Sequence, residues 1–128
     1  MPTDQASRRI NDILKNIASI EAYTQGLTAR TLQDNQMAAD AVERCLERIA
    51  EAARKLGPRF DKVMGGDVDL HALRQFGSVM RHDYDTVDPA LIWNVIAAEL
   101  PKLKAAFQAL QKDHPLPERA AGPDFDPF

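Results

Sequence analysis

Apolar residues recur at alternating intervals of three and four along most of this chain, and that periodicity restricts the fold more than any other feature. Ile10, Ile13, Ile17 and Ile20 form one such stripe within a segment of about residues 4–23. This spacing places the four side chains on one face of an α-helix. No run alternates apolar and polar residues as a half-buried strand does. We therefore predict an all-α protein without a sheet.

A long second helix is predicted over residues 29–56. Gly26 interrupts the first helix, and Thr28 can cap the second. The apolar seam of this second helix has one polar interruption at Asn35 and consists of Leu32, Ala39, Val42, Leu46, Ile49, Ala53 and Leu56. Gly57 and Pro58 indicate its end, because glycine tolerates the left-handed position after a helix and proline cannot continue the hydrogen bonding.

A third helix is predicted over residues 70–83, after a loop at residues 58–66. Asp67 or Asp69 can cap its first turn with a side-chain oxygen. Its expected buried stripe consists of Leu73, Phe76 and Met80. The opposite face of this helix is polar.

Asp88 followed by Pro89 predicts the start of a fourth helical segment, because proline at the first turn loses no hydrogen bond. Inward-facing apolar residues continue from Ile92 to Leu110. Pro101 should kink this segment or split it in two. The expected architecture is an antiparallel bundle of four to five helices with short connections.

The 128 residues are a usual length for one domain. We expect a helical domain over residues 1–112 and a flexible, proline-rich tail over residues 113–128. No apolar run is long enough to span a membrane. The single cysteine, Cys45, cannot form an internal disulfide, and residues 1–9 lack the layout of a signal peptide, so a cytoplasmic protein is expected. The net charge of −3 disfavours an extensive nucleic-acid surface but allows a locally basic site.

The polar face of the third helix gathers groups that can act on a phosphodiester. It consists of Arg74, Ser78, Arg81, His82 and Asp85, opposite the apolar stripe. Guanidinium groups bind phosphate through paired hydrogen bonds, and imidazole transfers protons near neutral pH. This set favours RNA cleavage without a metal ion; the alternative is a solvated helix face.

Metal and cofactor motifs are missing from the sequence. The three histidines, His71, His82 and His114, lack the spacing of metal ligands, and one cysteine cannot build a cysteine zinc site. Gly65 and Gly66 are not followed by the lysine of a phosphate-binding loop. We therefore expect no metal and no cofactor.

The sequence resembles the HepT-like family, the HEPN-domain ribonuclease toxins of MNT/HepT toxin–antitoxin systems. The segment 74–84 (RQFGSVMRHDY), followed by Asp88, Trp93 and ELPKL at 99–103, carries this resemblance. Residues 20–24 (IEAYT) and 49–52 (IAEA) extend it, so that it covers roughly residues 8–112. The resemblance implies a five-helix HEPN domain that acts as a homodimer. It also implies metal-independent cleavage of RNA where two copies of the motif face each other, and an MNT-type nucleotidyltransferase antitoxin as partner.

The family motif is an arginine, a polar residue, three further residues, a histidine, one residue and a tyrosine. The resemblance thus assigns catalysis to His82, substrate binding to Ser78 and adenylylation by the antitoxin to Tyr84. Gly77 stands at the motif's arginine position. This departure supports an alternative: a catalytically weakened HEPN module that pairs with a nucleotidyltransferase or RNA without cleaving. A helical scaffold without a nucleic-acid role is a third possibility.

Arg81 can supply the missing charge from one turn later. Side chains in a helix lean toward the N-terminus, so the Arg81 guanidinium should extend over the turn that contains Gly77. We therefore predict Arg81 as a catalytic residue beside His82. Arg74 lies one turn earlier and leans away, so it is predicted to bind substrate only.

Overall fold

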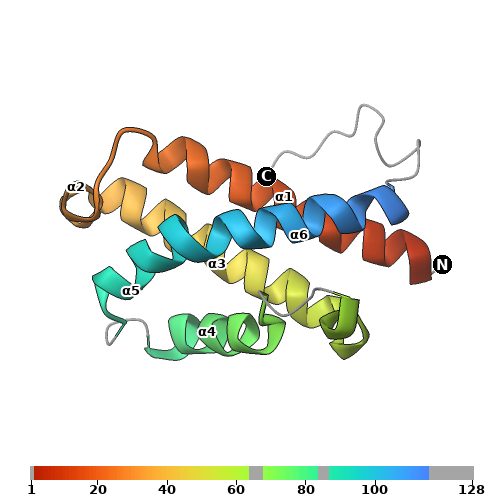
Figure 1. Ribbon diagram of the computed structural model, residues 1–128. Helices are drawn as coiled ribbons and strands as arrows, with labels where there is room; N and C mark the ends of the chain where they lie inside the picture. Colours follow the sequence, from red (N-terminus) through yellow and green to blue (C-terminus); the bar gives the residue numbers. More distant parts are fainter. Residues whose placement is uncertain (1, 64–67, 84–86, 116–128) are drawn as a thin grey trace.

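The computed structural model describes residues 2–63, 68–83 and 87–115, and these residues are helical apart from turns and caps, with no strand. The long helices of this part are α1 (Pro2–Thr24), α3 (Gln36–Leu56), α4 (Leu70–Asp83) and α6 (Leu100–Asp113). Figure 1 shows α3 lying between α1 and α4 and running antiparallel to both, with α6 packed across α1. The predicted all-α antiparallel bundle is confirmed.

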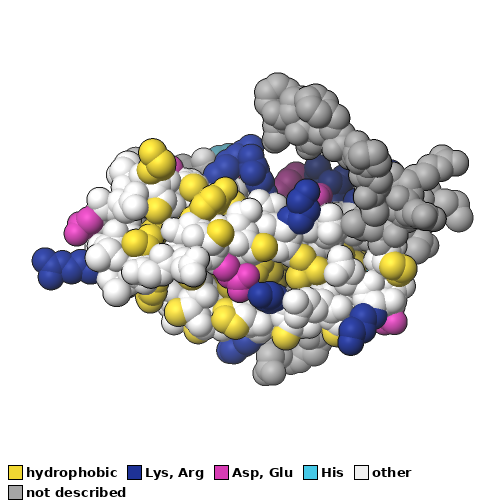
Figure 2. Space-filling view, turned by 90° about the horizontal axis from the view of Figure 1, so that it is seen from above, with side chains coloured by type: hydrophobic (Ala, Val, Ile, Leu, Met, Phe, Trp, Pro, Cys, Tyr) yellow, Lys and Arg dark blue, Asp and Glu magenta, His cyan; other side chains and the backbone are white. Residues whose placement is uncertain are grey.

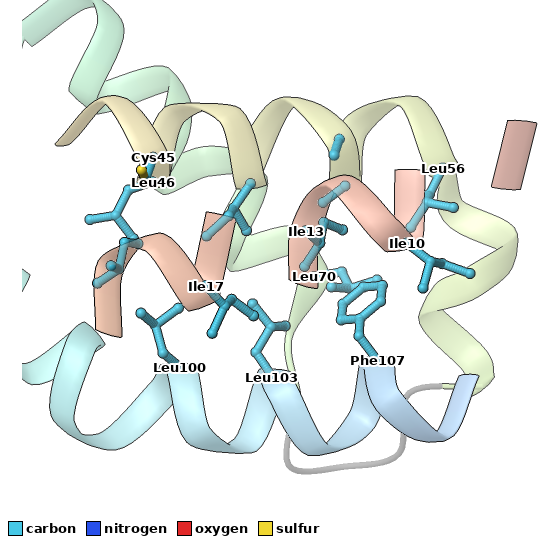
Figure 3. Close-up of a cluster of buried hydrophobic side chains, with 14 of the residues drawn as sticks. Ile10, Ile13, Ile17, Cys45, Leu46, Leu56, Leu70, Leu100, Leu103 and Phe107 are labelled. Atoms are coloured by element: carbon cyan, nitrogen blue, oxygen red, sulfur yellow. The ribbon is translucent and has the colours of Figure 1, made fainter. Parts of the chain in front are cut away.

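The core lies between α1, α3 and α6. The isoleucine stripe of α1 is completely buried: Ile10, Ile13, Ile17 and Ile20 are each at most 1% exposed. Figure 3 shows three of these side chains pointing toward Leu100, Leu103 and Phe107 of α6. Each fully buried large aliphatic side chain contributes about 1.5 to 3 kcal/mol. Cys45 of α3 is buried in the same cluster, and burial raises the pKa of its thiol.

The predicted helix over residues 29–56 is wrong at one residue, because Asn35 divides it into α2 (Ala29–Asp34) and α3. Thr28 caps α2 as predicted, and its Oγ1 accepts a hydrogen bond from the Thr31 N–H at 3.2 Å. Asn35 leaves the helical conformation, with φ −106° and ψ 91°. Its Oδ1 accepts the Ala38 N–H at 3.0 Å. This cap stabilises the start of α3 and offsets the helical hydrogen bonds that are lost where α2 ends.

Gly57 ends α3 as predicted, with a φ of 84°. The predicted loop after it is instead a 3-10 helix, η1 (Pro58–Val63), over the residues that the structure describes there. Phe60 is 6% exposed and belongs to the core, so this segment is anchored by an aromatic side chain. Proline at its first position is compatible with a helical turn.

Pro101 splits the fourth segment, as predicted. The short helix α5 (Pro89–Asn94) begins at Asp88, whose Oδ1 accepts the Ala90 N–H at 2.9 Å. Next comes a π-helical turn, η3 (Val95–Glu99), and the Leu100 N–H donates to the Val95 carbonyl, five residues back. Proline has no N–H and its ring crowds the preceding turn, which a wider turn accommodates.

Two further predictions concern the limits of the domain and the membrane. The predicted tail begins where α6 ends, at Asp113, but residues 116–128 lie outside the described residues, so this boundary stays a prediction. Within the described parts of the chain, no helix has the length and apolarity needed to cross a bilayer.

Candidate functional site

The helix α4 carries every described residue of the predicted site. Asp69 caps it: the Asp69 Oδ1 accepts the Ala72 N–H at 2.9 Å, and its carbonyl accepts the Leu73 N–H at 3.1 Å. The helix spans Leu70–Asp83, which confirms the predicted bounds. The residues that α4 buries are Leu70, Gly77 and Met80, whereas Leu73 and Phe76 are only half-buried. The predicted buried face was therefore misplaced by roughly 50° around the helix.

Gly77 lies at a close approach between α4 and α3. A Cβ atom at this position would overlap the Cβ of Ala50 on α3. Both atoms would be fixed to helical backbone, so neither could move aside without separating the helices. The absence of a side chain at Gly77 is therefore a packing requirement. An arginine, which the family motif has here, does not fit between these helices.

Arg81 extends over the turn that contains Gly77, which confirms the direction predicted for its side chain. Its Nη1 lies 3.9 Å from the position that a Cβ of Gly77 would occupy. The residue is exposed and makes no ion pair or side-chain hydrogen bond with the described residues. Its guanidinium is thus available to a ligand from solvent.

Ser78 and His82 lie one turn apart on the same side of α4, and both are exposed. Together with Arg81 they form one exposed strip, which we call the Arg-His strip. Arg81 and His82 also belong to the last turn of α4. Positive charge there interacts favourably with the helix dipole, a structural role that both residues can have besides any chemistry.

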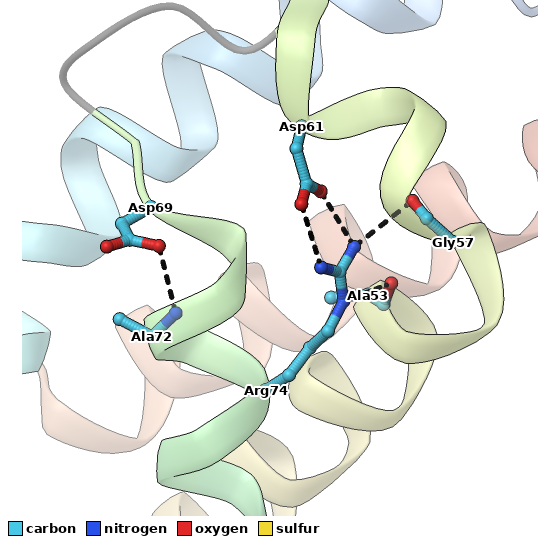
Figure 4. Close-up of polar contacts among 6 residues, drawn as sticks. All are labelled: Ala53, Gly57, Asp61, Asp69, Ala72 and Arg74. Carbon is cyan, nitrogen blue, oxygen red and sulfur yellow. Dashed lines mark hydrogen bonds and ion pairs between the residues drawn. The ribbon is translucent and has the colours of Figure 1, made fainter.

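Arg74 is held inside the molecule by four hydrogen bonds, shown in Figure 4. Its Nη1 and Nη2 donate to the Asp61 carboxylate at 3.1 and 2.9 Å. Its Nε donates to the Ala53 carbonyl at 3.0 Å, and Nη2 donates to the Gly57 carbonyl at 3.1 Å. The side chain is 16% exposed. Arg74 thus fixes α4 to the end of α3 and to η1, and its predicted contact with substrate stays untested.

Tyr84, the predicted site of adenylylation, lies outside the described residues. Of the other histidines, His71 is exposed on α4, and the ring of His114 packs edge-on against Phe60 with 5.7 Å between centroids. No three His, Cys, Asp or Glu residues come together as a metal site in the described part of the chain.

A groove along α1 and α3 is the feature that sequence reasoning missed. Its volume is about 780 Å³, and it extends from these two helices to Arg81 on α4. Seven Lys or Arg and three Asp or Glu residues line it, an excess of four positive charges in a chain whose net charge is −3. Sequence periodicity hinted at it only through Arg44, Arg48 and Lys55, which are spaced four and seven apart on one side of α3.

Each carboxylate of this groove has an arginine neighbour on its own helix. The three pairs are Arg9–Asp12 at 3.5 Å, Arg44–Glu47 at 4.0 Å and Arg54–Glu51 at 2.8 Å. Hydrogen bonds from Arg54, with the nearby charges of Arg54, Lys55 and Arg81, lower the pKa of Glu51 to about 2. The groove therefore stays positive on balance across the physiological pH range.

Comparison with known proteins assigns the chain to a class. A protein of Thermococcus cleftensis named "Probable ribonuclease HepT" is 26% identical over 103 residues, which cover 80% of this chain and 93% of that protein. The protein "Putative RNase MJ1216" of Methanocaldococcus jannaschii is 27% identical over 113 residues, covering 88% of this chain and 93% of its own. No solved structure matches the chain. These relatives support a ribonuclease-type function.

The particular family follows from a family model. The model described as "Ribonuclease HepT-like" matches residues 13–110. The chain therefore belongs to the ribonuclease HepT-like family, which confirms the resemblance found in the sequence. The matched region contains the whole Arg-His strip, the close approach at Gly77 and the groove apart from Arg9 and Asp12.

Proposed function

We propose that this protein is a metal-independent endoribonuclease toxin that acts as a homodimer in the cytoplasm. Its antitoxin would be an MNT-type nucleotidyltransferase that adenylylates Tyr84. Membership of the ribonuclease HepT-like family supports the reaction class. The observation that carries the assignment to residues is the position of the Arg81 guanidinium, over the turn where the family motif has its arginine.

The proposed reaction is attack of an RNA 2′-hydroxyl on the adjacent phosphorus. The bond between the 2′-oxygen and phosphorus forms, and the bond between phosphorus and the 5′-oxygen breaks. His82 of one copy accepts the proton of the 2′-hydroxyl, and His82 of the second copy returns a proton to the 5′-oxygen. Arg81 stabilises the extra negative charge on the phosphorane, and Ser78 donates a hydrogen bond to a phosphate oxygen. The products are a 2′,3′-cyclic phosphate and a 5′-hydroxyl.

Adenylylation of Tyr84 would regulate this reaction through charge and bulk. The motif tyrosine follows His82 by two residues, so an AMP group there would bring a phosphate close to the Arg-His strip. That phosphate would compete with RNA for the arginine, because both are anions that guanidinium binds. Modification would therefore block substrate rather than unfold the protein.

Gly77 supports the alternative of a HEPN module that binds but does not cleave. The packing of Gly77 against Ala50 explains why this residue is a glycine without reference to catalysis. The motif arginine can therefore be absent without Arg81 having taken over its role. In this alternative the exposed Arg81 and His82 serve binding or helix stability only. A cleavage assay separates the two functions, because only the nuclease requires the His82 imidazole.

The decisive experiment measures cleavage of a labelled RNA by the purified protein and by His82→Ala. Loss of the general acid and base should lower the rate by about 10² to 10⁴. His71→Ala, an exposed histidine on the same helix, is the matched control and should retain full activity. The mass of each variant in solution, measured by light scattering, shows that assembly is intact. Equal cleavage by His82→Ala and the unaltered protein would refute the proposed function.

Arg81 is tested in the same assay by two substitutions. Arg81→Ala should lower the rate by about 10² to 10³, the usual loss when a charge-stabilising donor is removed. Arg81→Lys keeps the positive charge but not the paired hydrogen-bond donors, so its cleavage rate should lie between those of Arg81→Ala and the unaltered protein. Full activity of Arg81→Ala would exclude the substitution of Arg81 for the motif arginine.

A further inference from the structure

The groove along α1 and α3 contains four cations that form no salt bridge with the described residues, although Lys55 and Arg81 lie near enough to Glu51 to lower its pKa. These are Lys15, Arg48, Lys55 and Arg81. All four are exposed, and they come from three different helices. The groove as a whole keeps an excess of four positive charges over its three carboxylates, and such an excess favours a polyanionic ligand. Nothing in the proposed reaction uses the first three of them.

The shape of the groove matches an extended strand. On α1 its lining runs from Arg9 to Ser19, and on α3 from Arg44 to Lys55. At 1.5 Å per helical residue, each side is about 15 to 17 Å long. Figure 1 shows α1 and α3 as antiparallel neighbours. Side chains from both helices line the same groove, so the two rows flank one path. That length accommodates several consecutive phosphate groups.

The lining also shows which class of polyanion fits. Among the described residues that line it, Ala52 is the one apolar side chain and none is aromatic, so these residues lack the apolar anchors of a protein interface. These described side chains also offer no ring on which a base could stack. Asn16 and Ser19 can donate to phosphate or sugar oxygens. These groups suit a nucleic-acid backbone, bound through its phosphates and without regard to sequence.

The groove ends at the proposed reaction site. Figure 2 shows Lys and Arg side chains along the upper, left and lower edges of the face seen from above, with hydrophobic side chains scattered between them. Arg81 belongs both to the groove and to the Arg-His strip on α4. A strand that lies in the groove would therefore pass directly to the side chain proposed to stabilise the phosphorane.

We propose that the groove between α1 and α3 is the path of the RNA substrate, held as a single strand by Lys15, Arg48 and Lys55 and delivered to Arg81 and His82. This inference rests on the proposed function for the identity of the ligand. It adds a binding surface away from the reacting groups. The three groove cations bind substrate but have no part in the bond-making step.

The test measures the salt dependence of RNA binding, in the His82→Ala background so that the strand is not cut. Each phosphate contact on a single strand contributes about −0.7 to the slope of log K against log salt. Four contacts give a slope of about −3, or roughly a 50-fold loss of affinity between 50 and 200 mM salt. The triple variant Lys15→Ala, Arg48→Ala, Lys55→Ala should reduce that loss to about threefold. Fluorescence anisotropy of a labelled oligoribonucleotide of mixed sequence gives both values.

A control of equal charge makes the result specific to the groove. Arg30→Ala, Lys102→Ala, Lys112→Ala removes three exposed cations from α2 and α6, none of which lines the groove. This variant should keep the original slope. The same slope in the groove variant and in the His82→Ala protein without further changes would overturn the inference, as would equal slopes in the groove and control variants.

Cleavage by the unaltered protein, measured in parallel, separates the two proposals. If His82→Ala abolishes cleavage while the groove variant binds RNA normally, the proposed RNA path is wrong and the proposed nuclease function is supported. If the groove variant loses RNA binding although His82→Ala cleaves normally, the RNA path is supported and the proposed chemistry is wrong. If no RNA binds even at low salt, the groove inference is refuted and an acidic protein partner takes its place.

Discussion

Replacing Gly77 by alanine tests the close approach of α4 and α3, on which the geometry of the Arg-His strip depends. The added Cβ would overlap that of Ala50, a residue only 2% exposed. Overpacking a core costs about 1 to 3 kcal/mol, and the rigid attachment of both atoms favours the upper half of that range. Alanine regains about 1 kcal/mol of helix propensity over glycine. The net loss of unfolding free energy should be about 1 to 2 kcal/mol.

The second half of this experiment is the exchange of the two residues. Ala50→Gly alone should cost about 1 kcal/mol through helix propensity. In the double variant the new Cβ at residue 77 occupies the space that residue 50 has vacated. The double variant should therefore lose at most about 1 kcal/mol, less than the sum of the single losses, with a coupling energy of about 2 kcal/mol.

Urea unfolding measures these free energies, with the fluorescence of the single tryptophan, Trp93, and helical circular dichroism as probes. The control is Ala105→Gly, a change in an exposed position of α6, which should add independently to Gly77→Ala. Additivity of Gly77→Ala and Ala50→Gly to within about 0.5 kcal/mol would refute the close approach.

Two more predictions concern polar contacts. Arg74→Ala should lower the free energy of unfolding by about 2 to 3 kcal/mol, because it leaves the Asp61 carboxylate and two carbonyls without their donor; an unchanged urea midpoint would contradict this. Glu51→Gln should lower stability by about 0.5 kcal/mol near neutral pH, a small effect because the carboxylate is more than a third exposed. The folded pKa of Glu51, about 2, lies below the ordinary 4.5, so its contribution is complete above pH 4.5 and is lost as the pH falls toward 2. A difference between Glu51→Gln and the unaltered protein that persists undiminished at pH 2 would contradict that assignment.

The fold could be predicted from the sequence wherever burial follows one helical period. The isoleucines of α1 and the bounds of α4 are examples, because a periodic stripe and a capping aspartate act locally. The break at Asn35 could not be predicted, because capping a new helix and continuing the old one are close in free energy at an asparagine. The helix η1 could not be predicted either, because its conformation depends on Phe60 packing into a core formed by helices distant in the sequence.

The candidate site divides in the same way. The direction of Arg81 was predictable because side chains lean consistently along a helix. The partner of Arg74, Asp61, is set by how α4 packs on the end of α3, which no local pattern encodes. The groove brings Lys15 beside Arg48, more than thirty residues later in the chain. Only the packing of α1 on α3 makes these charges one surface.

Positive charge is concentrated in the groove of this small acidic protein. The groove has an excess of four positive charges, although the whole chain has a net charge of −3. A polyanion that approaches the groove is attracted over about the 8 Å screening length of physiological salt. The molecule would therefore turn its groove toward a strand before the two touch, and its isoelectric point of 5.6 conceals this preference.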